Sequence, residues 1–145
     1  MAPLIDSAVQ TSPVHPRGFC PPPPGGAEVV FLGRTRRESH PTHGGLQRLH
    51  YQVHVDLTAT LLRELAEEAA ERWDLSAVRV QHATGDVGIG EASVCIEVIS
   101  DHRGAGFDAC RWLIDTVKAR VPIWKQEVWE DGTTWVDGTP VMDQP

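Results

Sequence analysis

Hydrophobic positions recur along the chain with two periods, one typical of strands and one typical of helices. Residues 46–53 alternate between apolar and polar side chains, which predicts a strand with one buried face. Shorter apolar or alternating runs predict further strands at residues 27–32, 78–84, 92–100, 123–129 and 133–136. Asp131 and Gly132 separate the last two runs and predict a hairpin turn between them.

Two segments show the helical period instead. Leucines and alanines repeat every four residues after Asp56, the expected N-cap, and predict a helix to about Arg72 whose four glutamates face solvent. A second helix is expected from about Ala105 to Arg120, because Pro122 disfavours helix at the residue before it. Its expected buried stripe consists of Phe107, Cys110, Ile114 and Val117.

Glycine and proline mark the segments between these elements. The basic stretch 34–45 is expected to be a loop, and the glycine-rich stretch 85–90 a loop or bulge. Seven of the eleven prolines lie in residues 1–24, which are therefore expected to form an extended or flexible arm. The folded domain is expected over residues 25–137, followed by a C-terminal tail at 138–145. Interspersed strands and helices with short connections favour a single α+β domain, with a mostly antiparallel sheet and two main helices.

Composition narrows the class of protein. The formal net charge of -7 argues against a general nucleic-acid binder, and no apolar run is long enough to cross a membrane. The first residues lack the basic and apolar pattern of a secretory signal, so a cytoplasmic protein is expected. The three cysteines are scattered and fit reduced thiols, with Cys95 and Cys110 in the core. His40 and His43 have no further ligand nearby in the sequence, so no metal site is expected.

Basic residues in this acidic chain gather at the expected ends of elements. The three clusters consist of Arg34, Arg36 and Arg37; His102 and Arg103; and Lys118, Arg120 and Lys125. Each cluster alone could be a set of surface charges that balance nearby acids. Together they favour a phosphate or carboxylate ligand, because guanidinium groups and helix N-termini both bind anions.

The chain has only two lysines, and they lie within eight positions of each other. A lysine can lose its proton near neutral pH when it is desolvated, whereas an arginine cannot, so lysine suits a nucleophile or base. Lys118 lies at the edge of the apolar stripe of its helix, where a lysine can also simply extend into water. From the residues alone, both interpretations remain open.

Four motifs, in the same order, make the chain resemble the catalytic large subunit of molybdopterin synthase, the MoaE family. Residues 26–36 match GA-x-x-x-F-x-G-x-x-R, and residues 100–107 are similar to the S-x-HR-x-x-AF segment. Residues 115–127 match D-x-x-K followed by PIWK-x-E, and residues 132–135 match G-x-x-W. The resemblance extends over about 25–136, and the PIWK-x-E motif with its upstream lysine is the most specific part.

This resemblance implies an α/β-hammerhead fold and a sulfurtransferase without a permanently bound cofactor. Such enzymes convert cyclic pyranopterin monophosphate into molybdopterin. The sulfur comes from the thiocarboxylated C-terminal Gly-Gly of a small ubiquitin-like MoaD-type subunit. By carry-over, Lys118 and Lys125 would be catalytic. Substrate would be bound by these lysines together with Arg34, Thr35, Arg36, His102, Arg103, Gln126 and Glu127, and Phe31 and Ile114 would line the pocket.

Helix geometry adds an expectation about assembly. Arg103 and Lys118 are 15 residues apart on one expected helix, which places them roughly 20 Å apart at 1.5 Å per residue. A small pterin cannot reach both ends within one chain. Two large subunits are therefore expected to pair within a heterotetramer, with His102 and Arg103 of one completing the Lys118 pocket of the other. Glu127 lies two residues after Lys125 on a strand, so it is expected on the same face, where it either pairs the lysine or tunes its protonation.

Several positions depart from the family pattern. His82 is followed by Ala83 where His-Arg is expected, Gln52 replaces a glutamate, and no Lys or Arg follows Trp135. The proline-rich arm also replaces a more ordinary N-terminal element. The missing arginine favours an alternative in which the same fold binds a phosphorylated ligand or a ubiquitin-like tail without turnover. Both lysines are retained, which favours the enzyme.

Overall fold

The central strands of the main sheet come from two continuous apolar runs. The computed structural model describes residues 2–136, in which β5 (Ala77–Ala83) and β7 (Ala92–Ser100) are buried on both faces. The sheet order is β1 (Leu4–Gln10), β5, β7 and β2 (Ala27–Arg34). β1 runs parallel to β5, and the other two pairs are antiparallel.

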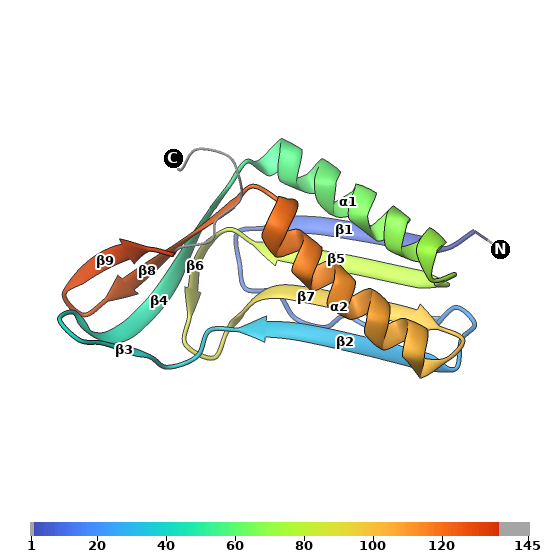
Figure 1. The fold of residues 1–145 in the computed structure, drawn as a ribbon, viewed down its shortest axis with the longest axis horizontal. Helices are drawn as coiled ribbons and strands as arrows, with labels where there is room; N and C mark the ends of the chain where they lie inside the picture. The colour runs from blue at the N-terminus through green and yellow to red at the C-terminus, as the bar shows by residue number, and fades with distance from the viewer. Residues whose placement is uncertain (1, 137–145) are drawn as a thin grey trace.

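A second sheet extends from the end of the main sheet at which β2 finishes (Figure 1). Its long strand β4 (Gly44–Val53) pairs antiparallel with β3 (Ser39–His40), β6 (Gly85–Gly88) and β8 (Ile123–Trp129). β9 (Gly132–Trp135) pairs with β8 through a two-residue turn at 130–131. The expected antiparallel α+β fold is confirmed, although the hairpin turn lies one residue before the expected position.

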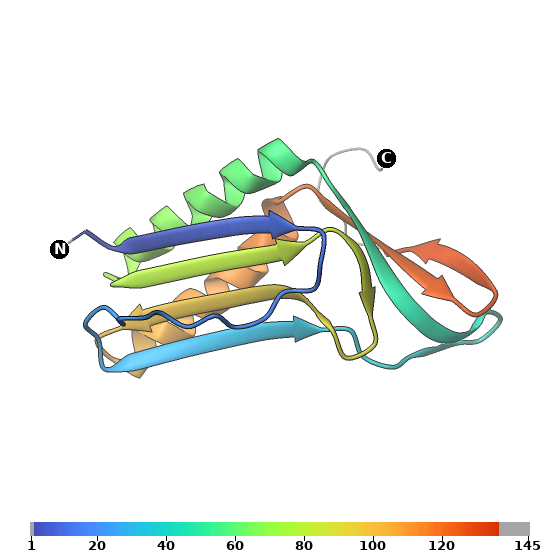
Figure 2. The same cartoon turned by 180° about the vertical axis from the view of Figure 1, so that it is seen from behind.

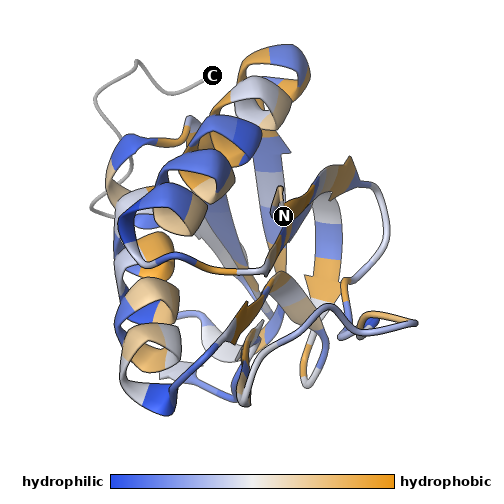
Figure 3. Ribbon diagram, turned by 90° about the vertical axis from the view of Figure 1, so that its right-hand side faces the viewer, coloured by the Kyte–Doolittle hydropathy of each residue, from blue (hydrophilic) through white to orange (hydrophobic). Residues whose placement is uncertain are grey.

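Helices α1 (Val55–Arg72) and α2 (Arg103–Arg120) both cover one face of the main sheet (Figure 1). The core beneath them includes Leu62, Ile96 and Leu113, each fully buried. The ribbons of both helices are banded orange and blue (Figure 3). This is the hydropathy expected of helices that bury one side only.

The segment between β1 and β2 crosses the opposite face of the main sheet (Figure 2). Arg79 of β5 binds Glu97 Oε2 at 2.7 Å and Asp6 Oδ2 at 2.8 Å, beneath this segment. Glu97 is fully buried and accepts backbone N–H groups of Arg17 and Gly18 through Oε1. The segment is therefore bound to the sheet by charge-assisted hydrogen bonds.

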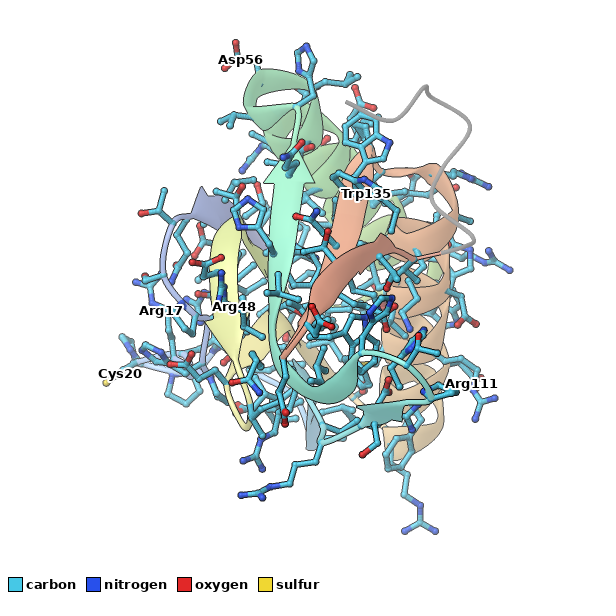
Figure 4. All side chains as sticks on the ribbon, turned by 90° about the vertical axis from the view of Figure 1, so that its left-hand side faces the viewer. Arg17, Cys20, Arg48, Asp56, Arg111 and Trp135 are labelled. Carbon is cyan, nitrogen blue, oxygen red and sulfur yellow. The ribbon has the colours of Figure 1, made fainter. Side chains whose placement is uncertain are left out.

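Four predictions about local structure are wrong. The ordered domain does not begin at residue 25, because β1 belongs to the main sheet. Gly85–Gly88 is a strand rather than a loop, and His54 rather than Asp56 caps α1 by accepting the N–H of Leu57 at 3.3 Å. Asp56 points from the exposed start of that helix (Figure 4). Phe107 is 60% exposed, although its spacing predicted burial.

The cysteines agree with the expectation from sequence. Cys95 and Cys110 are buried free thiols, and burial raises the pKa of each to about 11. Cys20 is exposed on the segment between β1 and β2 (Figure 4). Within residues 2–136, no helix is long and apolar enough to span a membrane.

Candidate functional site

The break between α2 and β8 brings the two lysines together. α2 ends at Val121, whose extended backbone (ψ 133°) precedes Pro122 and directs the chain into β8. Lys118 lies on the last turn of the helix and Lys125 on the third residue of the strand. Their charges interact, and Lys118 is the charged neighbour that lowers the pKa of Lys125 most.

Lys125 is half-buried, and its environment disfavours the protonated form. Burial is the largest cause of its lowered pKa, followed by the positive charge of Lys118. Glu127 and Glu38 oppose the shift, while Arg36 adds to it. Five charged side chains from α2, β8 and the β2–β3 connection therefore share one small region.

The two carboxylates of this region are each held by a partner. Glu127 accepts a hydrogen bond from Thr134 Oγ1 at 2.9 Å, and Glu38 accepts one from Arg36 Nε at 2.8 Å. Neither forms an ion pair with a lysine within 4.0 Å, so they moderate the positive potential of the region without neutralising it. The Lys125–Glu127 neighbourhood expected from strand alternation is present.

Beneath Lys125 lies a buried polar pair that the sequence did not single out as functional. Tyr51 is directly opposite Lys125 in the β4–β8 register, and its ring meets the ring of His82 edge-on at 5.2 Å. Burial raises the pKa of Tyr51 and lowers that of His82 to about 4. One signal was available: His82 is a histidine in an apolar strand, on the same side as the helix-facing residues Val78 and Val80.

Phe31 and Ile114, the expected pocket-lining residues, both lie on the helix side of the main sheet. Phe31 of β2 lies next to Cys110 of α2, because a backbone hydrogen bond from Phe31 partly offsets the raised pKa of the Cys110 thiol, and Ile114 lies one turn after Cys110 on α2. Both are partly buried against the core beneath the helices. Of the two, Ile114 lies one turn before Lys118 on α2.

Three expected substrate contacts do not face the lysines. Arg34, the last residue of β2, points towards the β6–β7 connection, where its Nε donates a hydrogen bond to the carbonyl of Gly90 at 3.0 Å. Thr35 is buried, and its backbone bonds to Glu91 and Gly90. Gln126 alternates with Lys125 and so projects from the opposite face of β8, next to His50 of β4. Arg36 is the member of this basic loop that the structure brings to Lys125.

His102 and Arg103 lie at the other end of α2. His102 is its N-cap and Arg103 its first residue, and both are exposed. The helix is continuous to Arg120, so about 22 Å of helix axis separates Arg103 from Lys118. Within one chain, this basic cluster and the lysine pair are separate.

The two histidines of the β3 region pack against an aromatic residue. The rings of His40 and His43 lie 4.4 Å apart, and His40 lies 5.2 Å from the ring of Trp129. Across residues 2–136, no group of three or more His, Cys, Asp and Glu side chains is placed to hold a metal ion.

Comparison with known proteins gives one consistent result. The model of the MoaE protein family matches residues 9–120. A molybdopterin synthase catalytic subunit of Arabidopsis thaliana is 38% identical over 84% of this chain and 61% of that protein. One of Pyrococcus abyssi is 32% identical over 78% of this chain and 75% of that protein.

Solved structures agree with this result. Molybdopterin synthase from Staphylococcus aureus superposes with a TM-score of 0.76 at 27% identity, covering 88% of this chain and 94% of that one. A complex of subunits 1 and 2 of the molybdopterin-converting factor of Helicobacter pylori contains a chain with a TM-score of 0.64. That chain is 23% identical to this one, and the match covers 77% of this chain and 72% of that chain. At this identity it shows likeness of fold alone.

Proposed function

The chain belongs to the MoaE protein family, and on this premise we propose that it is the catalytic large subunit of a molybdopterin synthase. Its reaction would convert cyclic pyranopterin monophosphate into molybdopterin by adding two dithiolene sulfurs. Each sulfur would come from a C-terminal thiocarboxylate of a small ubiquitin-like subunit, and water would return the tail to a carboxylate. No permanently bound cofactor is required for this chemistry.

The observation that carries the proposal is the half-buried Lys125 beside the exposed Lys118. Lys118, Lys125 and Arg36 concentrate positive charge in a chain whose formal net charge is -7. A cyclic phosphate and a thiocarboxylate are both anions, so a local positive pocket serves both. Lys125 is suited to donate and accept a proton, because burial and the charge of Lys118 lower its pKa. Lys118 is exposed and accessible to an incoming tail.

A MoaD-type partner with a Gly-Gly thiocarboxylate is part of the same proposal. It is supported by the resemblance in fold to one chain of the Helicobacter pylori two-subunit complex. The tail would reach the lysine pair at the break between α2 and β8. The proposed compartment is the cytoplasm, which agrees with three free cysteines among the described residues.

We further propose that two large subunits pair within a heterotetramer. His102 and Arg103 lie at the opposite end of α2 from Lys118, so one chain cannot present them to the same small ligand. Phe107 follows them by one turn and is 60% exposed, an unusual exposure for a phenylalanine. A subunit contact at this end of α2 would cover Phe107 and deliver His102 and Arg103 to the neighbouring lysine pair.

The departure at Ala83 does not favour a non-catalytic protein. Ala83 is fully buried in a core cluster with Val14 and Cys95, on the face of β5 opposite His82. The residue at this position therefore faces the segment that crosses the back of the sheet. Both lysines, at the end of α2 and on β8, are retained.

Reconstitution tests the function. The full chain is mixed with a thiocarboxylated small subunit and cyclic pyranopterin monophosphate, and molybdopterin is measured. The proposal expects product only when both are present. Tight binding of both ligands without any product would support the non-catalytic alternative and contradict the proposal.

A further inference from the structure

The β8–β9 hairpin contains a chain of three hydrogen-bonded side chains. Trp129 Nε1 donates to Thr134 Oγ1 at 2.9 Å, and Thr134 Oγ1 donates to Glu127 Oε1 at 2.9 Å. The direction follows from the groups themselves. An indole N–H can only donate, so the hydroxyl oxygen accepts it, and the single hydroxyl hydrogen is left for the carboxylate.

Strand pairing places all three side chains on one face of the hairpin. Thr134 is directly opposite Glu127 in the β8–β9 register. Trp129 follows Glu127 by two residues on the same face and is only 6% exposed, so its N–H depends on an acceptor within the protein. Lys125 precedes Glu127 by two residues on that face, about 6.6 Å along the strand.

Glu127 is therefore within reach of Lys125 but does not pair with it. Within residues 2–136, the carboxylate forms no ion pair with either lysine, and Thr134 is its only hydrogen-bond donor. Its charge still raises the pKa of Lys125, against burial and the charge of Lys118, which lower it. A carboxylate released onto the amine would stabilise the ammonium form further.

We propose that Thr134 is a positioning residue: its hydroxyl, fixed by Trp129, binds the Glu127 carboxylate and holds it away from Lys125. The amine then stays free to bind an anionic ligand and to exchange a proton. The catalytic consequence rests on the proposed function, whereas the positioning of Glu127 does not.

A neutral hydroxyl suits this position better than the alternatives. A lysine or arginine at position 134 would neutralise Glu127, and an apolar side chain would leave the Trp129 N–H without its acceptor and the carboxylate free to move. Lys125 has further titratable neighbours on several elements, which the test must leave in place. They are Lys118 of α2, Arg36 and Glu38 of the β2–β3 connection, Tyr51 of β4 and His82 of β5.

Three substitutions isolate the hydroxyl. Thr134→Val keeps the shape of the side chain without the hydroxyl, and Thr134→Ser keeps the hydroxyl. Thr133→Val is the matched control, because Thr133 is the preceding residue of β9, is exposed and projects from the other face. The chain has only two lysines, so 13C-lysine labelling gives two side-chain signals, which Lys118→Arg assigns.

The first readout is the titration of Lys125 in the free chain, which needs no turnover. Thr134→Val should raise the Lys125 pKa by at least about half a unit, because the released carboxylate stabilises the ammonium form. Thr134→Ser and Thr133→Val should leave the titration close to wild type. An unchanged or lowered Lys125 pKa in a folded Thr134→Val chain overturns the proposal.

A double substitution shows whether Thr134 acts through Glu127. In a Glu127→Gln chain, Thr134→Val should no longer move the Lys125 titration, since no carboxylate is left to release. A shift of the same size in both backgrounds would mean that Thr134 acts on Lys125 by another route, and would overturn the positioning role.

Turnover gives the third readout. The limb of the pH–rate profile that belongs to Lys125 should move to higher pH in Thr134→Val by the same amount as the titration, and Thr134→Ser should restore it. A rate loss that is equal at every pH would show a structural role only and overturn the positioning role. A shifted titration in a chain whose wild type makes no molybdopterin would support the positioning of Glu127 and refute the proposed function.

A fourth measurement applies if Thr134→Val does not fold. The indole 15N–1H signal of Trp129, which Trp129→Phe assigns among the five tryptophans, is compared between wild type and Glu127→Gln. A charged acceptor at the end of the chain polarises the hydroxyl, so loss of the charge should shift the indole signal. An identical signal in the two folded chains overturns the proposal.

Discussion

Lys125 differs from an ordinary surface lysine in that burial and a second lysine act on it in the same direction. Both lower its pKa, and the two carboxylates near it only partly compensate. The amine can therefore exchange a proton at a pH at which an exposed lysine stays charged. This property explains why position 125 holds a lysine and not an arginine. Histidine apart, nearly all the other basic residues of the chain are arginines.

Lys125→Arg tests the need for proton exchange while keeping the positive charge. An arginine stays protonated at all relevant pH values, so turnover should fall about 100-fold, within the usual range for loss of a general acid or base. The wild-type pH–rate profile should contain a limb below the pH 10.5 of an unperturbed lysine, and the variant should lack it. A variant that keeps both the rate and the limb would contradict this role.

His82 should make stability depend on pH. Its pKa in the folded chain is about 4, below the ordinary 6.5, so the unfolded chain binds the proton more readily. The contribution of His82 to the free energy of unfolding is complete above pH 6.5. It is lost as pH falls towards 4, and the total loss is about 3 kcal/mol. Urea unfolding of wild type and His82→Gln between pH 7 and 4 measures the difference. Parallel losses in both chains would contradict the assignment to His82.

At the scale of single residues, the sequence predicted which residue types form the site better than it predicted the direction in which each side chain points. The lysine pair and Glu127 follow from spacing and strand alternation, and the structure places them in one region. Gln126 shows the limit, because its position next to Lys125 in sequence puts it on the opposite face of β8. Tyr51 and His82 could not be found by spacing, since their contact depends on how β4 meets the end of β5.

Among the elements, the segment that crosses the back of the main sheet contributes stability through buried charge. Arg79 joins Asp6 of β1 to Glu97 of β7, and Glu97 also accepts two backbone N–H groups of the crossing segment. The guanidinium carbon of Arg79 also lies 4.4 Å from the centroid of the Phe19 ring, which adds a cation–π interaction. This network holds down a proline-rich stretch that has little hydrogen bonding of its own.

Arg79→Ala should therefore destabilise the fold strongly. The substitution leaves the fully buried Glu97 carboxylate without its counter-charge, and loss of one partner of a buried pair typically costs about 3–5 kcal/mol. Urea unfolding measures the loss. Arg63→Ala is the matched control, because Arg63 forms an exposed pair with Glu67, worth less than about 1 kcal/mol, and an exposed hydrogen bond to the Ile5 carbonyl at 3.4 Å. Equal effects of the two substitutions would refute the importance of the network.

The elements with strong periodicity were predicted, and those fixed by partners elsewhere in the chain were not. Both helices and strands β4, β5, β7 and β8 follow from their own hydrophobic patterns. β1 lies in a proline-rich stretch and becomes a strand because β5 offers it an edge. Gly85–Gly88 becomes β6 because β4 is long enough to pair with it as well as with β8. Phe107 follows the helical spacing but lies one turn after the start of α2 and is 60% exposed.

For the whole molecule, a pocket shared between two subunits makes a quantitative prediction. Lys118→Ala and Arg103→Ala chains should each be nearly inactive alone. After unfolding and refolding as an equal mixture, half of the dimers contain one chain of each kind, and each such dimer has one intact pocket. Activity should therefore return to about a quarter of wild type. A mixture no more active than its components would show that the two residues do not act across a subunit contact.

The family match and the fold agree over most of the chain, and the departures lie away from the lysine pair. Ala83 faces the back of the sheet, and Gln52 lies on the strand face opposite Tyr51. The tail at 138–145, whose lack of basic residues was noted from the sequence, lies outside the described residues. The account therefore depends most on Lys118 and Lys125.

The most direct test of these two lysines is molybdopterin formation by substituted chains in the reconstituted reaction. Lys118→Ala should lose nearly all activity and Lys125→Ala much of it, while both keep the far-ultraviolet circular dichroism of the wild type. Arg111→Ala is the control, since Arg111 is an exposed basic residue of α2 (Figure 4) that lies two turns, about 10 Å along the helix axis, before Lys118 and should retain full activity. Full activity in Lys118→Ala would contradict the account.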